Sequence, residues 1–504
     1  MLGDFALCSR ISSYPPVRVS PSVVRRSLPG STSPLVNMPT HRRTSTNSPP
    51  TRREWLRCGA FGAAGLTLSQ LLRMEAWAGV GSSTKAVVNI HLDGGPSQYE
   101  TIDPKPEAPL EIRGPFLPIE TSVPGIRISE LMPQVARLAD QFVFVRSLVG
   151  SDGQHNAFQC QSGFAEKDLK SFGGRPALGS VIAKLQCHPD DPAPGFVDLM
   201  QGRPLVRDSA RPGFLGPAYR PFRPDISAMF SRELEDGMKG ELARRGTEHS
   251  LKLTLDERLT LDRLADRQTL RTELDRVKRE LDASGMMAAM DQFDRQAAGI
   301  LTSGRLAEAL DLSKESPAVL SRYTASGPQR GVQDTTSEGA NAPQKFLLAR
   351  RLIEAGVRVV SVSISDFDTH SDNFPRMQNL VPIVDHGLAA FVTDLKERGL
   401  WDDVLVVVWG EFGRTPVVNS SGGRDHWPRV SPCLLAGGGL RCGQVIGSTD
   451  RSGAEPRSRP VTYKDIFRTL YRHLGIDAKQ ETLPDPQGRP QYLLDEGEVP
   501  RELA

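Results

Sequence analysis

Acidic residues and histidines recur where apolar stretches of this chain end, and these residue types bind metal ions. They occupy short polar segments that follow predicted strands, and the set consists of Asp93, Asp366, Asp368, His370, Glu411 and His426. Carboxylate oxygens and imidazole nitrogens suit one or two divalent ions, which polarise a phosphoryl or sulfuryl oxygen and activate a nucleophile. The pattern therefore predicts a divalent-metal site, with Zn, Mn, Ca and Mg all compatible with these donors.

Each of these residues also has a structural alternative when it is taken alone. The alternatives are a turn cap at Asp93, a surface acid at Asp366 or Asp368, an ion pair between Glu411 and Arg414, and an aromatic loop anchor at His426. His91, inside an apolar strand, is interpreted as a packed core histidine. The recurrence favours a functional site, because structural acids have no reason to gather repeatedly at strand ends. Arg414 is then predicted to hold an oxyanion through its bidentate guanidinium.

The elements that must position these residues alternate between strands and helices. Strands are predicted at 85–92, 142–149, 357–364, 404–409 and 432–436, and helices at 131–139, 154–163, 178–185, 346–355, 380–398 and 463–474. This alternation predicts an α/β fold with a mostly parallel sheet that helices cover on both faces. Since the carboxyl ends of parallel strands share one edge, residues far apart in sequence are expected to meet there.

Two further stretches of the sequence interrupt this alternation. Residues 190–225 are rich in Pro, Gly and Arg and are predicted to be loops. Residues 226–312 place apolar side chains at helical spacing among dense charges, which predicts a charged α-helical insertion over one side of the sheet. A dimerisation arm is the alternative for this insertion.

The N-terminal part of the chain has the features of an export signal. TRREWLR at 51–57 precedes a weakly apolar run to Leu72, and Ala76-Trp77-Ala78 provides a cleavage motif. A twin-arginine signal peptide is therefore predicted at 51–78, after a disordered extension at 1–50, with Met38 as an alternative start to Met1. We expect the twin-arginine translocase as a partner during export, and a periplasmic or extracellular location. A surface helix that carries two arginines is the alternative.

Composition excludes several other classes of protein. The chain has 504 residues, a formal net charge of +2 and 24% charged residues, so no strong field favours nucleic acid or a membrane surface. After Leu72 no apolar run approaches the length of a membrane span, and we expect no stable span in the mature chain. Four cysteines in the mature chain are too few for a disulfide scaffold, and Cys433 and Cys442 are either a bridge or two buried thiols.

Several motifs together resemble the bacterial family catalogued as domain of unknown function 1501, which is grouped with the alkaline phosphatase and sulfatase superfamily. They are GGPSQ at 94–98, DPKP at 103–106, LLARRLIEAGV at 347–357, DTH at 368–370, GEFGRTP at 410–416 and GRDHWP at 423–428. The resemblance covers about residues 85–480 and leaves 481–504 as a C-terminal tail. It implies an alkaline phosphatase-like fold and an exported, metal-dependent hydrolase acting on a small-molecule or polysaccharide ester of phosphate or sulfate.

The resemblance also assigns roles to individual residues. It implies that Asp93 is the metal aspartate of the first strand, that Asp366 or Asp368 binds the other metal with His370, and that His426 is the last histidine ligand. Glu411 and Phe412 stand where the superfamily has an Asp-His pair.

The nucleophile position implied by the same resemblance falls near Gly153, so the nearest candidates are Ser151, Asp152 and His155. The alternative function is a non-catalytic exported binding or scaffold protein that keeps this fold.

Overall fold

The protein is described from a computed structural model that covers residues 85–165, 167–168, 174–188, 191–200, 208–224, 226, 303–325 and 338–504. The predicted disordered extension at 1–50, the predicted leader at 51–78 and most of the predicted helical insertion at 226–312 lie outside these ranges. No helix within the described ranges is long and apolar enough to cross a membrane.

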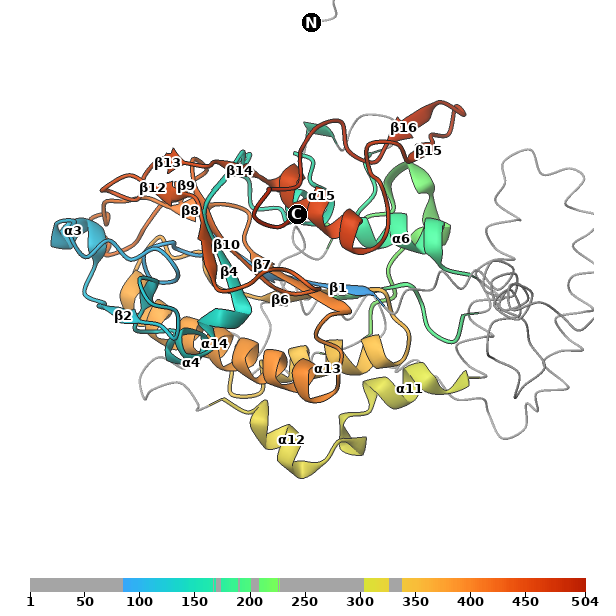
Figure 1. The fold of residues 1–504 in the computed structure, drawn as a ribbon, viewed down its shortest axis with the longest axis horizontal. Helices are drawn as coiled ribbons and strands as arrows, with labels where there is room; N and C mark the ends of the chain where they lie inside the picture. The colour runs from blue at the N-terminus through green and yellow to red at the C-terminus, as the bar shows by residue number, and fades with distance from the viewer. Residues whose placement is uncertain are drawn as a thin grey trace, which may run out of the picture. The chain divides into compact units, whose positions relative to one another are not determined.

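A central sheet of eight strands organises the fold (Figure 1). Its order is β11-β4-β10-β7-β1-β6-β5, and β14 pairs with β4. The strands are β1 (Ala86–Leu92), β4 (Phe142–Val149), β5 (Phe196–Leu199), β6 (Val359–Ile364), β7 (Val404–Trp409), β10 (Ser431–Gly437), β11 (Gln444–Ile446) and β14 (Val461–Thr462). β10 runs antiparallel to both of its neighbours, whereas the other pairings within this central sheet are parallel. The predicted fold class, a mostly parallel sheet flanked by helices, is confirmed.

Helices cover the sheet on two faces, each with its own apolar core. One core contains Val88, Ile90 and Leu92 of β1 and packs against α4 (Pro133–Arg137), α13 (Gln344–Glu354) and α14 (Asn373–Glu397). The other contains Val87 of β1 and packs against α5 (Phe158–Ser162), α6 (Leu178–Gln186) and α15 (Tyr463–His473). Figure 1 shows α13 and α14 on one side of the sheet and α6 and α15 on the other. Successive strand residues serve opposite faces, and helices cover both faces, which explains why β7 is apolar along its whole length.

Shorter elements complete the described chain. The helical ones are α3 (Leu110–Arg113), η1 (Ala139–Gln141), η3 (Gly213–Leu215), η4 (Pro217–Tyr219), α11 (Arg305–Leu310), η6 (Leu312–Lys314) and α12 (Pro317–Arg322). The strand pairs are β2 (Pro118–Glu120) with β3 (Arg127–Ser129), β8 (Gly413–Arg414) with β9 (His426–Trp427), β12 (Ser448–Thr449) with β13 (Pro456–Ser458), and β15 (Thr482–Pro484) with β16 (Pro490–Tyr492).

The structure differs from the expected elements in a few places. β5 lies within the stretch predicted to be loops, and α14 begins seven residues before its predicted start at 380. The predicted C-terminal tail forms β15 and β16 and contributes Leu493, Leu494 and Leu503 to the core of α15. Cys433 and Cys442 are both free thiols, so the bridge between them is not formed.

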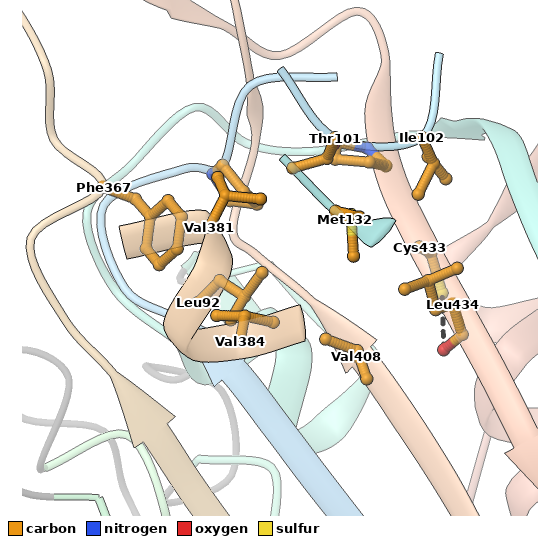
Figure 2. Close-up of a pocket in the computed structure, with 12 residues that line it drawn as sticks. Leu92, Thr101, Ile102, Met132, Phe367, Val381, Val384, Val408, Cys433 and Leu434 are labelled. Atoms are coloured by element: carbon orange, nitrogen blue, oxygen red, sulfur yellow. Dashed lines mark hydrogen bonds between the residues drawn. The ribbon is translucent and has the colours of Figure 1, made fainter. Parts of the chain in front are cut away.

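A small apolar cavity lies between the sheet and α14 (Figure 2). Its lining includes Leu92, Met132, Phe367, Val384 and Val408. Phe367 belongs to the loop after β6, so the cavity lies just beneath the segment that carries the acidic residues.

Filling this cavity is expected to stabilise the protein. Val384→Ile adds one methylene against Leu92 and Val408, and its burial is worth about 0.8 kcal/mol. The midpoint of urea unfolding is expected to rise with an unchanged slope. Val384→Ala is the opposite control. It is expected to lower the free energy of unfolding by roughly 2 kcal/mol, and therefore to lower the midpoint. A lower midpoint for Val384→Ile would show that the cavity cannot accept a methylene without strain.

Candidate metal centre

The predicted acids and histidines meet at the carboxyl edge of the sheet. Asp93 directly follows β1, Asp368 lies in the loop after β6, and Glu411 lies in the loop after β7. β9 brings His426 to the same edge, where it pairs with Arg414 of β8. Parallel neighbours β7, β1 and β6 end together, which is why loops more than 300 residues apart along the chain converge here.

The first group, called here the histidine cluster, consists of His155, Asp368, His370 and His426. His370 Nε2 lies 3.1 Å from Asp368 Oδ1 and 3.0 Å from His426 Nε2. His155 Nε2 lies 3.3 Å from Asp368 Oδ2, and His426 Nε2 lies 3.7 Å from Asp368 Oδ1. Three imidazoles thus surround one carboxylate that is 15% exposed.

The second group, called here the buried cluster, consists of His91, Asp93 and Glu411. His91 Nε2 lies 3.3 Å from Glu411 Oε2, and both side chains are almost completely buried. Within the described ranges, His91 Nδ1 has no hydrogen-bond partner, and His91 Nε2 and Glu411 Oε2 have only each other. Buried polar atoms left in this state cost free energy, and a cation bound among them would satisfy them.

The donor spacing fits a small divalent ion. Zinc lies about 2.0–2.1 Å from nitrogen and oxygen ligands, so the edge of a regular tetrahedron around it is roughly 3.3–3.4 Å. The closest contacts between donor atoms within the clusters run from 3.0 to 3.7 Å, and all donor atoms of a cluster lie within 4.8 Å of one another. Charge-assisted hydrogen bonds are shorter, at about 2.7–2.9 Å. The contacts between the imidazoles and the carboxylates of the clusters are therefore compatible with a metal centre, whereas Arg414 and Asp425 make tight ion pairs beside it.

His91 is the ligand candidate that sequence reasoning placed in the core instead. Its ring is indeed fully buried, but it faces Glu411 and belongs to the buried cluster. The spacing to Asp93 carried a signal, because residues two apart along a strand project from the same face. A histidine in a mostly apolar strand, two residues before a strand-end acid, thus indicates a shared site.

Asp366 and Asp368, which the sequence left as alternatives, have different places. Asp368 is at the centre of the histidine cluster, whereas Asp366 belongs to neither cluster. The backbone of Asp366 has φ of 77°, a left-handed conformation that costs a non-glycine residue about 1 kcal/mol or more. Of these two acids, only Asp368 is therefore a ligand candidate in the structure.

Arg414 is fully buried and its guanidinium binds groups of the protein itself. Nη2 donates to Asp368 Oδ1 at 2.7 Å and also to the carbonyl of Gly94. Nε donates to the Gly95 carbonyl at 3.0 Å, and Nη1 donates to the Arg424 carbonyl at 2.8 Å. The predicted ion pair of Arg414 is thus with Asp368 rather than Glu411. The oxyanion-binding role of Arg414 stays a prediction. To bind an oxyanion, the guanidinium would have to give up one of these hydrogen bonds.

The loop after β4 supplies the candidates near the nucleophile position. The Ser151 hydroxyl donates to the Glu411 carbonyl and accepts a bond from Gly153 N at 3.1 Å. His155 faces both clusters, with Nδ1 3.2 Å from Glu411 Oε1. Two residues of this loop are predicted to be catalytic. The His155 ring contacts the carboxylates of Asp368 and Glu411, whereas the Ser151 hydroxyl contacts only backbone atoms.

Neighbouring groups orient the imidazoles. His370 Nδ1 lies 2.6 Å from Asp425 Oδ1, which assigns the proton to Nδ1 and leaves Nε2 facing the cluster. The ring of Phe412 stacks on His426 with centroids 4.2 Å apart. Phe412, which stands where the resemblance implied an imidazole, thus supports a histidine ligand candidate by packing.

Close packing explains the glycine turn after β1. Gly94 has φ of 109°, and a Cβ built on it would lie 2.3 Å from the backbone nitrogen of Asp368. The turn therefore needs glycine both for its conformation and for the approach of the two strand-end loops.

Electrostatics of the clusters follow from these contacts. Burial disfavours the charged ring of His155, but hydrogen bonds to Asp368 and Glu411 raise its pKa to about 9. Burial works against ionisation of Asp368, yet its bonds with His155, His426 and Arg414 hold its pKa well below the usual range. Without a metal ion, His155 is therefore a cation between two carboxylates.

This raised pKa predicts how the metal-free protein responds to alkali. Since the pKa of His155 rises from 6.5 to about 9 on folding, its stabilising contribution is complete below about pH 6.5 and is lost as pH rises through 9. For EDTA-treated protein, we expect the free energy of unfolding to fall by about 1 kcal/mol between pH 6.5 and 9.5, after allowance for solvent screening. Urea unfolding at a series of pH values measures it. If the free energy of unfolding of His155→Gln fell by the same amount over this pH range, the fall could not be due to the raised pKa of His155.

The fold and the site together define a class: an α/β protein whose central sheet gathers two groups of candidate metal ligands at its carboxyl edge. Residues 84–504 match the family model described as "Protein of unknown function (DUF1501)". The chain belongs to this family, which confirms the resemblance seen in the motifs. No curated protein matches the chain.

Solved structures similar to this chain include sulfatases and a protein of the alkaline phosphatase superfamily. The PsFucS1 sulfatase from Pseudoalteromonas sp. is 12% identical, with 86% of this chain and 73% of that chain covered and a TM-score of 0.34. A protein in the alkaline phosphatase superfamily from Vibrio parahaemolyticus is 12% identical, with 78% and 67% covered and a TM-score of 0.35. The phosphonate monoester hydrolase of Agrobacterium radiobacter is 16% identical, with 78% and 74% covered and a TM-score of 0.31.

Proposed function

We propose that this protein is an exported metal-dependent hydrolase of phosphate or sulfate esters. The observation that carries the proposal is the pair of donor clusters at one sheet edge, one of which is almost completely buried and gathers His91, Asp93 and Glu411. The types of donor atom and their spacing fit divalent ions. The His370 side chain is 49% exposed, so the centre is open to solvent.

The residues divide into two ligand sets. Asp368, His370 and His426 would hold one ion, and His91, Asp93 and Glu411 would hold the other. Bound ions would polarise the ester oxygen and activate the attacking oxygen. Asp425 keeps the proton of His370 on Nδ1, and Arg414 holds the Gly94–Gly95 turn against Asp368. His155 and Ser151 lie at the proposed reacting centre, with Ser151 bonded to the Glu411 carbonyl.

Metal analysis followed by activity assays tests this proposal. Protein folded with Zn²⁺, Mn²⁺, Ca²⁺ or Mg²⁺ is analysed for bound metal and assayed with aryl phosphate, aryl phosphodiester and aryl sulfate substrates. We expect stoichiometric metal and hydrolysis of at least one ester class, with both reduced in His426→Ala. His188→Ala, an exposed histidine in a different part of the chain, is the matched control. Folded protein that never retains stoichiometric metal would refute the proposal.

Export is the second part of the proposal and rests on the twin-arginine motif at 51–57. This route accepts passengers that have already folded, so a metal centre assembled in the cytoplasm is compatible with it. Fractionation of cells that make the full chain should place the wild type outside the cytoplasm. The double substitution Arg52→Lys and Arg53→Lys is expected to retain the protein inside. Equal export of both chains would count against this route.

A non-catalytic binding protein is the second candidate, because two features depart from a hydrolase centre. Gly153 stands at the expected nucleophile position, and the Ser151 hydroxyl is bonded to backbone. Stoichiometric metal without turnover of any of the three ester classes would favour this candidate.

A further inference from the structure

We propose that His155 is a ligand shared by two metal ions, with Nε2 on the ion of the histidine cluster and Nδ1 on the ion of the buried cluster. This inference rests on the metal binding in the proposed function and assigns a role to His155, which lies two residues after the nucleophile position implied by the resemblance. A single imidazolate would then join the two halves of the centre.

The position of the ring carries the inference. Nε2 lies 3.3 Å from Asp368 Oδ2, and Nδ1 lies 3.2 Å from Glu411 Oε1. The two nitrogens thus face carboxylates of different clusters, from opposite sides of one ring. Both separations are close to the donor spacing of a tetrahedral zinc site, which is roughly 3.3–3.4 Å.

The surrounding structure fixes the ring in this position. It packs edge-on against His426, with centroids 4.3 Å apart, and against Phe412 at 5.1 Å. Ser151 binds the loop of His155 directly to the Glu411 backbone, and Gln159 Nε2 donates to the Gly150 carbonyl at 2.7 Å. The loop and the buried cluster are therefore held together, so the ring is placed before any ion binds.

Glu411 can face both partners at once because its two oxygens are used differently. Oε1 accepts a bond from Gly94 N at 2.9 Å and faces His155, whereas Oε2 faces His91. An ion beside this carboxylate can therefore be reached by His91 from one side and by His155 from the other.

Charge balance favours a shared imidazolate. Asp93, Asp368 and Glu411 carry three negative charges, while two divalent ions carry four positive charges and the Arg414 guanidinium adds one more. When the protonated ring of His155 binds both ions, each ring nitrogen donates a lone pair and both ring protons pass to solvent. The imidazolate then supplies a fourth negative charge at the point between the ions, where positive charges repel most strongly.

Copper substitution tests the shared ligand directly. Full-length protein freed of metal and loaded with two equivalents of Cu²⁺ is studied by electron paramagnetic resonance. An imidazolate bridge couples the two spins, so we expect wild type to lose most of its signal relative to total bound copper. His155→Gln and His155→Ala are expected to show the full signal of uncoupled ions, with circular dichroism confirming that they fold. His188→Gln is the matched control and should stay coupled.

Each other outcome overturns the inference. Two bound coppers with full, uncoupled signal in wild type would do so, as would coupling that survives in both folded His155 variants. A phosphoryl or sulfuryl group trapped on His155 during turnover would make the ring a nucleophile instead.

Ester hydrolysis by the Zn²⁺ or Mn²⁺ form, measured separately, distinguishes this inference from the proposed function. Coupled ions without hydrolysis would refute only the hydrolase, and hydrolysis with uncoupled ions would refute only the shared ligand. Protein that binds no metal would refute both.

Discussion

Replacing Asp368 with asparagine is expected to remove metal from the histidine cluster and to abolish ester hydrolysis. Asp368 contacts three imidazoles and Arg414, so it is the side chain on which this cluster depends. Asparagine keeps the size of the side chain but removes the negative charge that attracts a cation. Losing a group that only orients a ligand weakens metal binding by about 10–100-fold. We therefore expect Asp368→Asn to weaken it by more than about 100-fold.

Metal content after dialysis and the rate of ester hydrolysis measure this effect. Asp402→Asn changes an exposed acid outside both clusters and is the matched control. Circular dichroism checks the fold, because the substitution also leaves the buried Arg414 without its anionic partner. Full metal content and full activity in a folded Asp368→Asn variant would place the metal elsewhere.

Most strands and helices were predictable because their patterns are local. Strand β4 matches its predicted range, and β7 does too, since runs of β-branched and aromatic residues between turn signals are characteristic of buried strands. β5 was missed because its four residues lie among many Pro, Gly and Arg residues. It forms through pairing with β6, a contact that no local pattern contains.

The direction of β10 was equally hidden from the sequence. Its apolar residues predict a strand, but they do not say which way it runs. The antiparallel pairing with β4 and β7 places the start of β10, rather than its end, at the edge of the site. The loop that carries His426 leads into this start, and that is how His426 reaches Asp368.

Within the site, the residue types were predictable and their relations were not. Acids and histidines at strand ends indicated a metal centre, and five of the six predicted ligands fall in one cluster or the other. The exception is Asp366, whose positive φ depends on the surrounding loop. His91 was assigned to the core because burial and ligation share the same sequence pattern until the partner, Glu411, is known.

Replacing Arg414 with methionine is expected to be the most destabilising single change at this edge of the sheet. The guanidinium joins Asp368 to the Gly94 and Gly95 carbonyls and to the Arg424 carbonyl, all in a fully buried position. Methionine fills part of the volume but satisfies none of these acceptors, and Asp368 is left as a partly buried anion. Removing one partner of a buried ion pair costs about 3–5 kcal/mol.

Urea unfolding of the metal-free protein measures this cost, and Arg429→Met provides the comparison. Arg429 pairs with Glu455 at the surface, where both side chains are largely exposed, so its loss should cost less than about 1 kcal/mol. Arg414→Lys is expected to fall between the two, because lysine keeps the charge but lacks the planar fork that reaches several acceptors. If Arg414→Met cost no more than Arg429→Met, the Gly94–Gly95 turn and Asp368 would be held in place by packing. The larger cost means that the same residue that anchors the fold here also fixes the position of the central carboxylate of the histidine cluster.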